Sequence, residues 1–344
     1  MKMNKLALLT SLFCLSMTAC TGGNNSINTT EPQKSETPSV EPEPEKHINV
    51  FVLTGQSNME GNTRFSESNL KQVFADLNIE DADDVFGEGI PEVQTSFYGC
   101  GYGQIYTESN VHASNNEAGH KIDGKFLNTK VGMGNSDSSI GPELGAAYVL
   151  RNEIDSEYPV YFIKCGISGS GFAQNDSQGD KINWNVEKDE NLYVNILKPY
   201  TQNCLNLIEE ATGEKPIIKG FLWNQGESDA DPKKYPVYND RFDALVGQFK
   251  EDFGEYAPDE DGENIAVIDA LIYEKNKPET QAINDEKLKN VERHDNYYYV
   301  DATEREGGMA LTMGGDNLHY DLKSMVRLGM AYGQAILDNG LLDF

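Results

Sequence analysis

Short runs rich in β-branched and aromatic residues alternate with longer stretches of helical periodicity through most of this 344-residue chain. Such an alternation predicts an α/β fold, in which a parallel sheet carries helices on both faces. The first run is almost continuously apolar, as expected of a central strand buried on both faces. The predicted strands are residues 47–54, 160–164, 217–223, 265–271 and 297–300.

Residues 79–140 interrupt this alternation. They are rich in Asp, Gly, Asn and Tyr and show no sustained periodicity. An irregular segment of this length within a globular domain is usually either functional or disordered. We expect it to form one wall of an active site.

The first residues predict a leader for export. Lys2 and Lys5 border an apolar run that is too short to span a bilayer, which indicates a signal peptide over residues 1–19. The tetrapeptide M-T-A-C that ends at Cys20 resembles the bacterial lipobox, so we expect Cys20 to be lipidated. Cleavage of an ordinary signal peptide nearby is the alternative.

Residues 20–46 are dominated by Pro, Glu, Ser and Thr, which predicts a lipidated cysteine followed by a disordered tether. Residues 47–344 contain no second linker and are predicted to form one domain. The expected location is therefore the bacterial cell envelope, with the protein lipid-anchored at the outer membrane, in the periplasm or on the cell surface. The sequence does not select the membrane leaflet or the oligomeric state.

The charge balance excludes one class of partner. The chain has 56 acidic and 28 basic residues, a formal net charge of −28. Such a surface repels phosphate backbones, so no nucleic-acid binding is expected. Membrane contact is expected through the lipid anchor only.

Cysteines and acidic clusters give no metal site. The predicted domain contains three cysteines, Cys100, Cys165 and Cys204, so at most one disulfide can form within it, and the spacing does not say which. Residues 259–262, D-E-D-G, faintly resemble a calcium loop but lack its other ligand positions. We expect no metal and no cofactor.

A first polar cluster, T-G-Q-S-N-M, directly follows the first predicted strand and contains Ser57. A serine at a strand-to-helix transition lies near backbone N–H donors that stabilise negative charge, as a nucleophile requires. The alternative is an ordinary helix N-cap. The G-x-S-x-G elbow is absent, because position 59 is Met.

Two further clusters supply the remaining parts of a serine mechanism. The sequence W-N-Q-G-E-S-D follows the third predicted strand, and its Gln225 could donate an amide hydrogen to an oxyanion. The sequence D-N-L-H precedes the last predicted helix, so Asp316 could fix the tautomer of His319, which could then accept a serine proton. A polar turn and a solvated loop histidine are the respective alternatives.

Taken together, the three clusters resemble the SGNH hydrolases, and more narrowly the sialate O-acetylesterase and family-6 carbohydrate esterase group, which is acetylxylan esterase-like. Supporting matches are G-P-E-L at residues 141–144 and K-C-G-I-S-G-S at residues 164–170. The resemblance covers nearly all of residues 48–340. It implies a three-layer α/β/α sandwich with a short, about five-stranded parallel sheet of the flavodoxin-like kind.

The resemblance also implies residue roles. Ser57 matches the nucleophile, His319 the general base, and Asp316 the acid that orients the histidine; Glu227 is a rival for that last role. The implied oxyanion hole uses the backbone N–H groups of Ser57 and Gly169 and the side chain of Gln225.

The implied activity is removal of acetyl groups from glycans, either acetylated plant polysaccharide or O-acetyl sialic acid. A broad-range SGNH lipase or esterase is one alternative, and a non-catalytic glycan-binding surface lipoprotein is the other.

Overall fold

The computed structural model describes residues 47–100, 111–113, 124–154, 157–173, 183–274 and 277–342. The predicted signal peptide (1–19), Cys20 and the predicted tether (20–46) lie outside these residues, as do parts of the segment 79–140. None of the described helices has the length and apolarity needed to cross a membrane.

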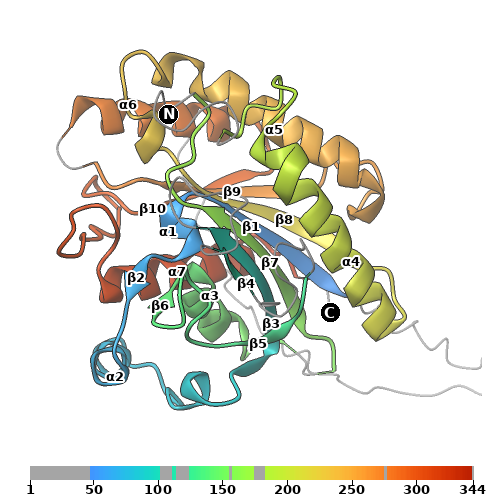
Figure 1. Ribbon diagram of the computed structural model, residues 1–344, viewed down its shortest axis with the longest axis vertical. Helices are drawn as coiled ribbons and strands as arrows, with labels where there is room; N and C mark the ends of the chain where they lie inside the picture. Colours follow the sequence, from blue (N-terminus) through green and yellow to red (C-terminus); the bar gives the residue numbers. More distant parts are fainter. Residues whose placement is uncertain are drawn as a thin grey trace, which may run out of the picture. The chain divides into compact units, whose positions relative to one another are not determined.

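An eight-stranded sheet forms the centre of the structure, in the order β10-β9-β8-β1-β7-β3-β4, with β5 also paired to β3 (Figure 1). The strands from β10 to β3 run parallel, whereas β4 and β5 are antiparallel to β3. The strands are β1 (Asn49–Gly55), β3 (Ile90–Cys100), β4 (Val111–Ala113), β5 (Leu127–Thr129), β7 (Val160–Ile167), β8 (Ile217–Asn224), β9 (Ala266–Leu271) and β10 (Tyr297–Asp301); β2 (Thr63–Arg64) and β6 (Ser139–Ile140) form a separate pair.

The five predicted strands correspond to β1, β7, β8, β9 and β10, but the prediction of about five strands was too low. The longest strand, β3, lies inside the segment that we predicted to be irregular. Its sequence IPEVQTSFYGC has a proline at its second position and mixes polar with apolar residues, so neither alternation nor a continuous apolar run marks it. Pairing with β7 stabilises it instead.

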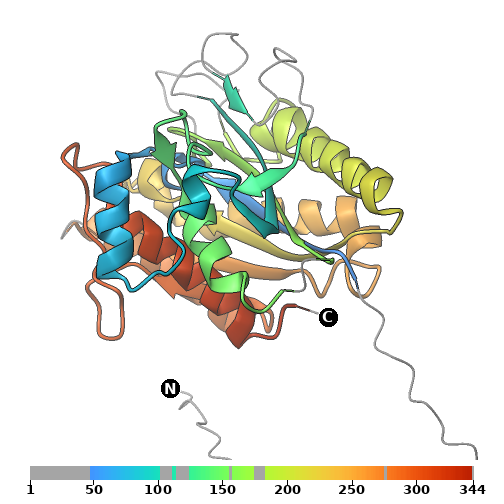
Figure 2. The same ribbon diagram turned by 90° about the horizontal axis from the view of Figure 1, so that it is seen from below.

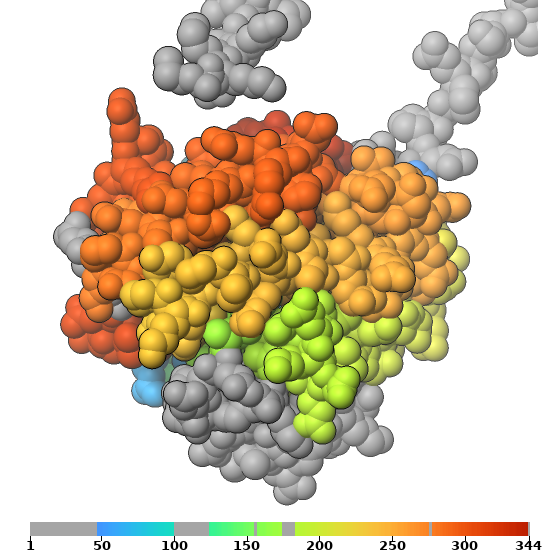
Figure 3. All heavy atoms as spheres, turned by 90° about the horizontal axis from the view of Figure 1, so that it is seen from above, coloured from blue at the N-terminus to red at the C-terminus, as the bar shows by residue number. Residues whose placement is uncertain are grey.

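Helices cover both faces of the sheet and confirm the three-layer α/β/α class (Figures 1 and 2). On β1, Val50 and Val52 face one apolar core while Phe51 and Leu53 face the other, as predicted for a central strand. The first core is closed by α4 (Lys198–Thr212), α5 (Tyr238–Phe253) and α6 (Pro278–Arg293); α5 and α6 form adjacent gold and orange bands in Figure 3. The second is closed by α2 (Glu67–Asp76), α3 (Pro142–Leu150) and α7 (Leu322–Asp338).

Short helical turns connect these elements. They are α1 (Ser57–Glu60), η1 (Asp84–Phe86), η4 (Tyr193–Leu197), η5 (Glu227–Asp229), η6 (Tyr235–Val237) and η7 (Gly254–Tyr256). The turns α1 and η5 directly follow β1 and β8, so the sequence clusters predicted to carry chemistry begin at the carboxyl ends of two adjacent strands.

Glycines allow α3 and α7 to approach closely. A Cβ atom at Gly329 would lie 2.1 Å from the carbonyl oxygen of Pro142, and one at Gly145 would lie 2.2 Å from that of Val326. We therefore expect Gly329→Ala to lower the free energy of unfolding by about 1–3 kcal/mol, measured by urea denaturation. Gly247→Ala in α5 is the matched control, because its Cβ would meet no atom within 4 Å. Equal stability of the two variants would contradict the close contact.

Candidate active site

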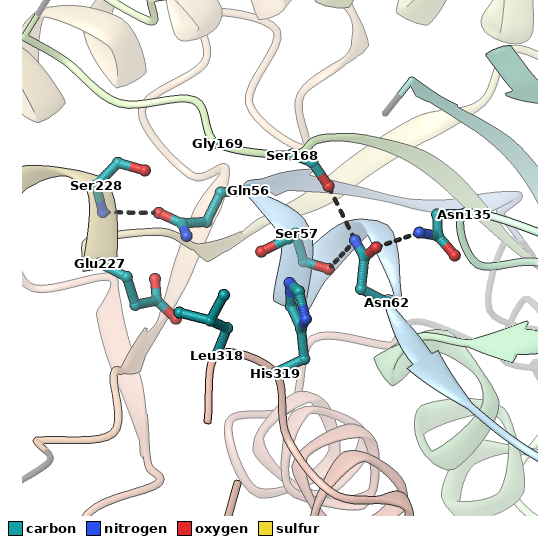
Figure 4. Close-up of a pocket in the computed structure, with 10 residues that line it drawn as sticks. All are labelled: Gln56, Ser57, Asn62, Asn135, Ser168, Gly169, Glu227, Ser228, Leu318 and His319. Atoms are coloured by element: carbon teal, nitrogen blue, oxygen red, sulfur yellow. Dashed lines mark hydrogen bonds between the residues drawn. The ribbon is translucent and has the colours of Figure 1, made fainter. Parts of the chain in front are cut away.

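The predicted clusters meet at one edge of the sheet. Gly55 at the end of β1 is in register with Gly166 on β7 and Asn224 on β8, so the polar residues that follow these strands lie together. A pocket of about 540 Å³ opens at this edge (Figure 4). It is lined by Gln56, Ser57, Asn62, Asn135, Ser168, Gly169, Glu227, Ser228, Leu318 and His319.

Ser57 occupies the first helical position of α1, and Gln56 is the N-cap residue. The alternative that Ser57 is itself the cap is therefore wrong. The backbone of Gln56 donates to the carbonyl oxygen of Asn224 at 2.9 Å, which fixes the turn against β8. Gly55 makes this approach possible, because a Cβ there would lie 2.1 Å from the same oxygen and its φ is +144°. The Ser57 side chain is held at the pocket wall.

His319 is oriented by Asp316. The imidazole Nδ1 lies 2.6 Å from Asp316 Oδ2, and Asp316 Oδ1 accepts hydrogen bonds from the backbone N–H groups of Leu318 (2.9 Å) and His319 (3.0 Å). Partial burial would raise the pKa of Asp316, but these hydrogen bonds prevail and lower it to about 2. An ionised Asp316 selects the Nδ1–H tautomer, which leaves Nε2 as an acceptor. Figure 4 shows the imidazole beside Ser57.

Glu227 lies in the same pocket but has a different partner. Its Oε1 accepts from the Asn58 side chain at 2.7 Å, and the Asn58 oxygen in turn accepts from the backbone N–H of Tyr320 at 3.3 Å. Of the two candidate carboxylates, Asp316 is the one that contacts the imidazole. Asn58 thus links the turn that carries Ser57 to the loop that carries His319, and Glu227 holds the Asn58 amide.

The side chain of Gln225 differs from its predicted role. It is fully buried and does not line the pocket. Its Nε2 donates to Asp229 Oδ2 (2.7 Å), Gln56 Oε1 (3.2 Å) and the carbonyl oxygen of Ser170 (3.2 Å). Because its amide hydrogens are directed at these acceptors, Gln225 cannot donate to an oxyanion in this geometry; it braces Gln56 and the loop after β7.

Gln56 was missed by sequence reasoning, although it stands beside Ser57. Its Oε1 faces three donors: Gln225 Nε2 and the backbone N–H groups of Gly226 (3.4 Å) and Ser228 (3.3 Å). This arrangement fixes the direction of the amide and turns Nε2 toward the pocket, as Figure 4 shows. The glutamine directly before Ser57 could have indicated a side-chain donor in the sequence. The direction of its amide, however, depends on partners that are distant in the sequence.

The opposite wall is built from polar residues that the motifs did not identify as functional. The Asn62 amide nitrogen donates to Ser168 Oγ at 2.9 Å and to the carbonyl oxygen of Ser57 at 3.2 Å. Asn135 also contacts Asn62, and it comes from the segment predicted to form a wall of the site. Gly169 follows Ser168 with a φ of +72° and lines the pocket. The pocket therefore presents amides and hydroxyls around Ser57.

Within the described ranges, no group of three or more His, Cys, Asp or Glu residues could hold a metal ion. In the D-E-D-G segment, the Asp259 carboxylate accepts from the backbone N–H groups of Gly262 (3.1 Å) and Asn264 (2.8 Å), so it closes a turn. No disulfide joins the buried Cys165 and Cys204; the side chain of Cys100 lies outside the description.

A family model described as "Carbohydrate esterase, sialic acid-specific acetylesterase" matches residues 103–338. The chain belongs to this family. The match includes Gln225, Glu227, Asp316 and His319 and begins after Ser57. Membership of this family makes the protein a carbohydrate esterase.

Two solved structures share the fold of this carbohydrate esterase. A protein from Arabidopsis thaliana has a TM-score of 0.51 and 19% sequence identity, over 86% of this chain and 99% of its own. NanS has a TM-score of 0.53 and 17% identity, over 86% of this chain and 98% of its own. A sequence search of curated proteins finds no match.

Proposed function

We propose that Ser57, His319 and Asp316 form the catalytic triad with which the protein hydrolyses O-acetyl esters on sugars. The observation that carries this proposal is the 2.6 Å contact between His319 Nδ1 and Asp316 Oδ2, in a loop whose histidine shares a pocket with Ser57. A carboxylate at Nδ1 leaves Nε2 ready to accept the serine proton. Glu227 then has a supporting role through Asn58.

The reaction follows from these positions. Ser57 Oγ attacks the acetyl carbonyl carbon while His319 Nε2 takes the hydroxyl proton. The C–O bond to the sugar then breaks, and His319 returns the proton to the leaving oxygen. Water, deprotonated by His319, hydrolyses the acetyl-enzyme and releases acetate. The proposed oxyanion donors are the backbone N–H groups of Ser57 and Gly169 and, in place of Gln225, the Gln56 side chain; each is worth roughly 2.7–4 kcal/mol.

The pocket lining favours a short acyl group and a polar alcohol. Among its ten residues, Leu318 is the one large apolar side chain, while the rest are glycine, hydroxyl, amide or ionisable residues. A lipase needs an apolar groove for a long acyl chain, and the described residues around this pocket offer none. An acetyl ester of a hydroxyl-rich sugar matches the lining better.

A second pocket of about 430 Å³ adjoins the first and shares Asn62 and His319 with it. It also contains Arg64, whose guanidinium makes no hydrogen bond or ion pair within the described part of the chain. The other five arginines each contact a carbonyl or carboxylate oxygen. Since His319 protonates the leaving oxygen, the sugar extends past His319. We propose that Arg64 receives a carboxylate of that sugar, as in O-acetyl sialic acid.

Arg64→Ala is therefore expected to lower kcat/KM for O-acetyl sialic acid about tenfold, mainly by raising KM, because a charge-assisted hydrogen bond is lost. An acetylated aryl ester carries no carboxylate and should be hydrolysed at an unchanged rate. Steady-state kinetics on both substrates measures the effect. Equal loss on both, or none on either, would contradict a carboxylate subsite and favour a neutral glycan such as acetyl-xylan.

The proposed function as a whole is tested by acetate release. The purified protein is given O-acetyl sialic acid, acetyl-xylan, an acetylated aryl ester and a long-chain ester. Faster hydrolysis of the acetylated sugars than of the long-chain ester supports the proposal. Preference for the long-chain ester would indicate the lipase alternative, and no release from any substrate would indicate the binding protein.

A further inference from the structure

Glu60 is a buried carboxyl at the end of the turn that Ser57 begins. It is the last residue of α1 and is 1% exposed. Two glycines make room for it: a Cβ at Gly99 would lie 2.7 Å from Glu60 Oε1, and one at Gly166 would lie 2.4 Å from Glu60 Cα. The adjacent strands β3 and β7 thus leave space for an acidic side chain directly behind the pocket.

Glu60 is held differently from two other buried acids. Glu143 pairs with Lys164 at 2.6 Å, and Asp269 pairs with Lys287 at 2.5 Å. Glu60 has no ion pair in the described structure. The charge of Lys164 on β7 acts on it, but that lysine is paired with Glu143 on α3. Its Oε1 lacks a hydrogen-bond partner among the described residues. Burial of such a group costs free energy, so stability alone gives no reason for an acid here.

The other oxygen of Glu60 contacts two residues of the pocket wall. Oε2 accepts from Ser168 Oγ and from the Asn62 amide nitrogen at 3.1 Å. Asn62 also donates to the carbonyl oxygen of Ser57, and Ser168 precedes Gly169. Glu60 therefore links the turn of the nucleophile to the glycine loop that faces it, without lining the pocket itself.

We propose that ionised Glu60 is a positioning residue for deacetylation, which holds Ser168 and Asn62 from behind the pocket and so fixes the glycine loop against the turn of Ser57. An ionised carboxylate only accepts hydrogen bonds, so the Ser168 hydroxyl points to Glu60 and its oxygen accepts from Asn62. A protonated Glu60 becomes a donor, and the Ser168 hydrogen must turn elsewhere. The inference rests on the proposed function, because the glycine loop carries Gly169, whose backbone N–H is a proposed donor to the acetyl oxyanion.

The protonation of Glu60 should therefore be visible in the rate. Burial raises the pKa of Glu60 to about 7, although hydrogen bonds from Ser168 and Asn62 and the charge of Lys164 oppose the rise. As pH falls through this range, the ionised form is lost. Neutral His319 is lost on acidification as well, since only the neutral imidazole accepts the serine proton. The acid limb of log kcat/KM against pH is then steeper than one over the range in which both groups titrate.

The test uses kcat and KM for an acetylated aryl ester between about pH 5 and pH 9, where carboxyl and imidazole groups titrate. The variants are Glu60→Gln, Ser168→Ala and their double mutant. Each single change is expected to lower kcat about tenfold with KM little changed, and to bring the slope of the acid limb down to one. The double mutant should lose far less than the product of the two single losses, because Glu60 and Ser168 share a contact. Glu67→Gln, the same change on an exposed carboxylate of α2, should match the native protein.

Multiplicative losses in the double mutant, or an acid limb in Glu60→Gln that stays as steep as in the native protein, would overturn the positioning role. If Glu60→Gln does not fold, Ser168→Ala decides alone, since native kcat and slope in that variant would also overturn it. A native protein that releases no acetate, or a Ser57→Ala variant that is equally active, would overturn the proposed function first. The two failures are thus distinguishable.

Discussion

Ser57→Ala is expected to reduce kcat for acetyl-ester hydrolysis by about 10⁴-fold or more, with KM little changed. The serine oxygen forms the bond to the acetyl carbon, and no water in the pocket would be positioned equally well. Rapid mixing with an acetylated aryl ester should also show a burst of product in the native protein, because an acetyl-enzyme accumulates if its hydrolysis is slow. The burst should be absent from Ser57→Ala.

Ser228→Ala is the matched control. Ser228 lines the same pocket, but its contact with Gln56 uses the backbone N–H, which alanine retains. Its activity should stay within about threefold of the native value, as is usual for a substitution that leaves hydrogen bonds and packing intact. A comparable collapse in both variants would indicate damage to the pocket, and full activity in Ser57→Ala would exclude it as the nucleophile.

Asp316→Asn is expected to produce the second largest loss, about 10³-fold in kcat. An asparagine can present its amide nitrogen to Nδ1 and stabilise the wrong tautomer, and it removes the charge that stabilises the imidazolium. Glu227→Gln should lose far less, because the amide oxygen can still accept from Asn58. Parallel kinetics on the two variants tests the assignment. A greater loss in Glu227→Gln would make Glu227 the orienting acid.

The sequence predicted the fold class because the parallel strands carry their signal locally. The run that became β1 is apolar on both faces, and its register with β7 and β8 brings the residues after those strands together. Strand β3 was missed because its polar residues and the proline at its second position obscure the strand pattern. The prediction that Cys20 anchors the protein stays a prediction, because the residue lies outside the described structure.

The motifs pointed to residues that the structure brings to one pocket, but they did not give the directions of the side chains. Gln225 and Gln56 both carry amides near Ser57, and only the tertiary hydrogen bonds show that Gln225 is buried while Gln56 faces the pocket. Glu60 follows the G-Q-S-N-M motif directly, yet its importance depends on Ser168, which is 108 residues away. The sequence shows which residue types are near a site, whereas the tertiary packing decides which of their atoms face the pocket.

The side chain of Asn58 joins Glu227 to the backbone of Tyr320. These two partners follow Asn58 in the chain by 169 and 262 positions, respectively. The helix that follows Tyr320 must also pack on α3 through Gly145 and Gly329 before the histidine loop is held. During synthesis, Ser57 emerges early, whereas His319, its proposed base, emerges only when nearly the whole chain has been made. If the proposed triad is correct, a product that ends before His319 would therefore be inactive.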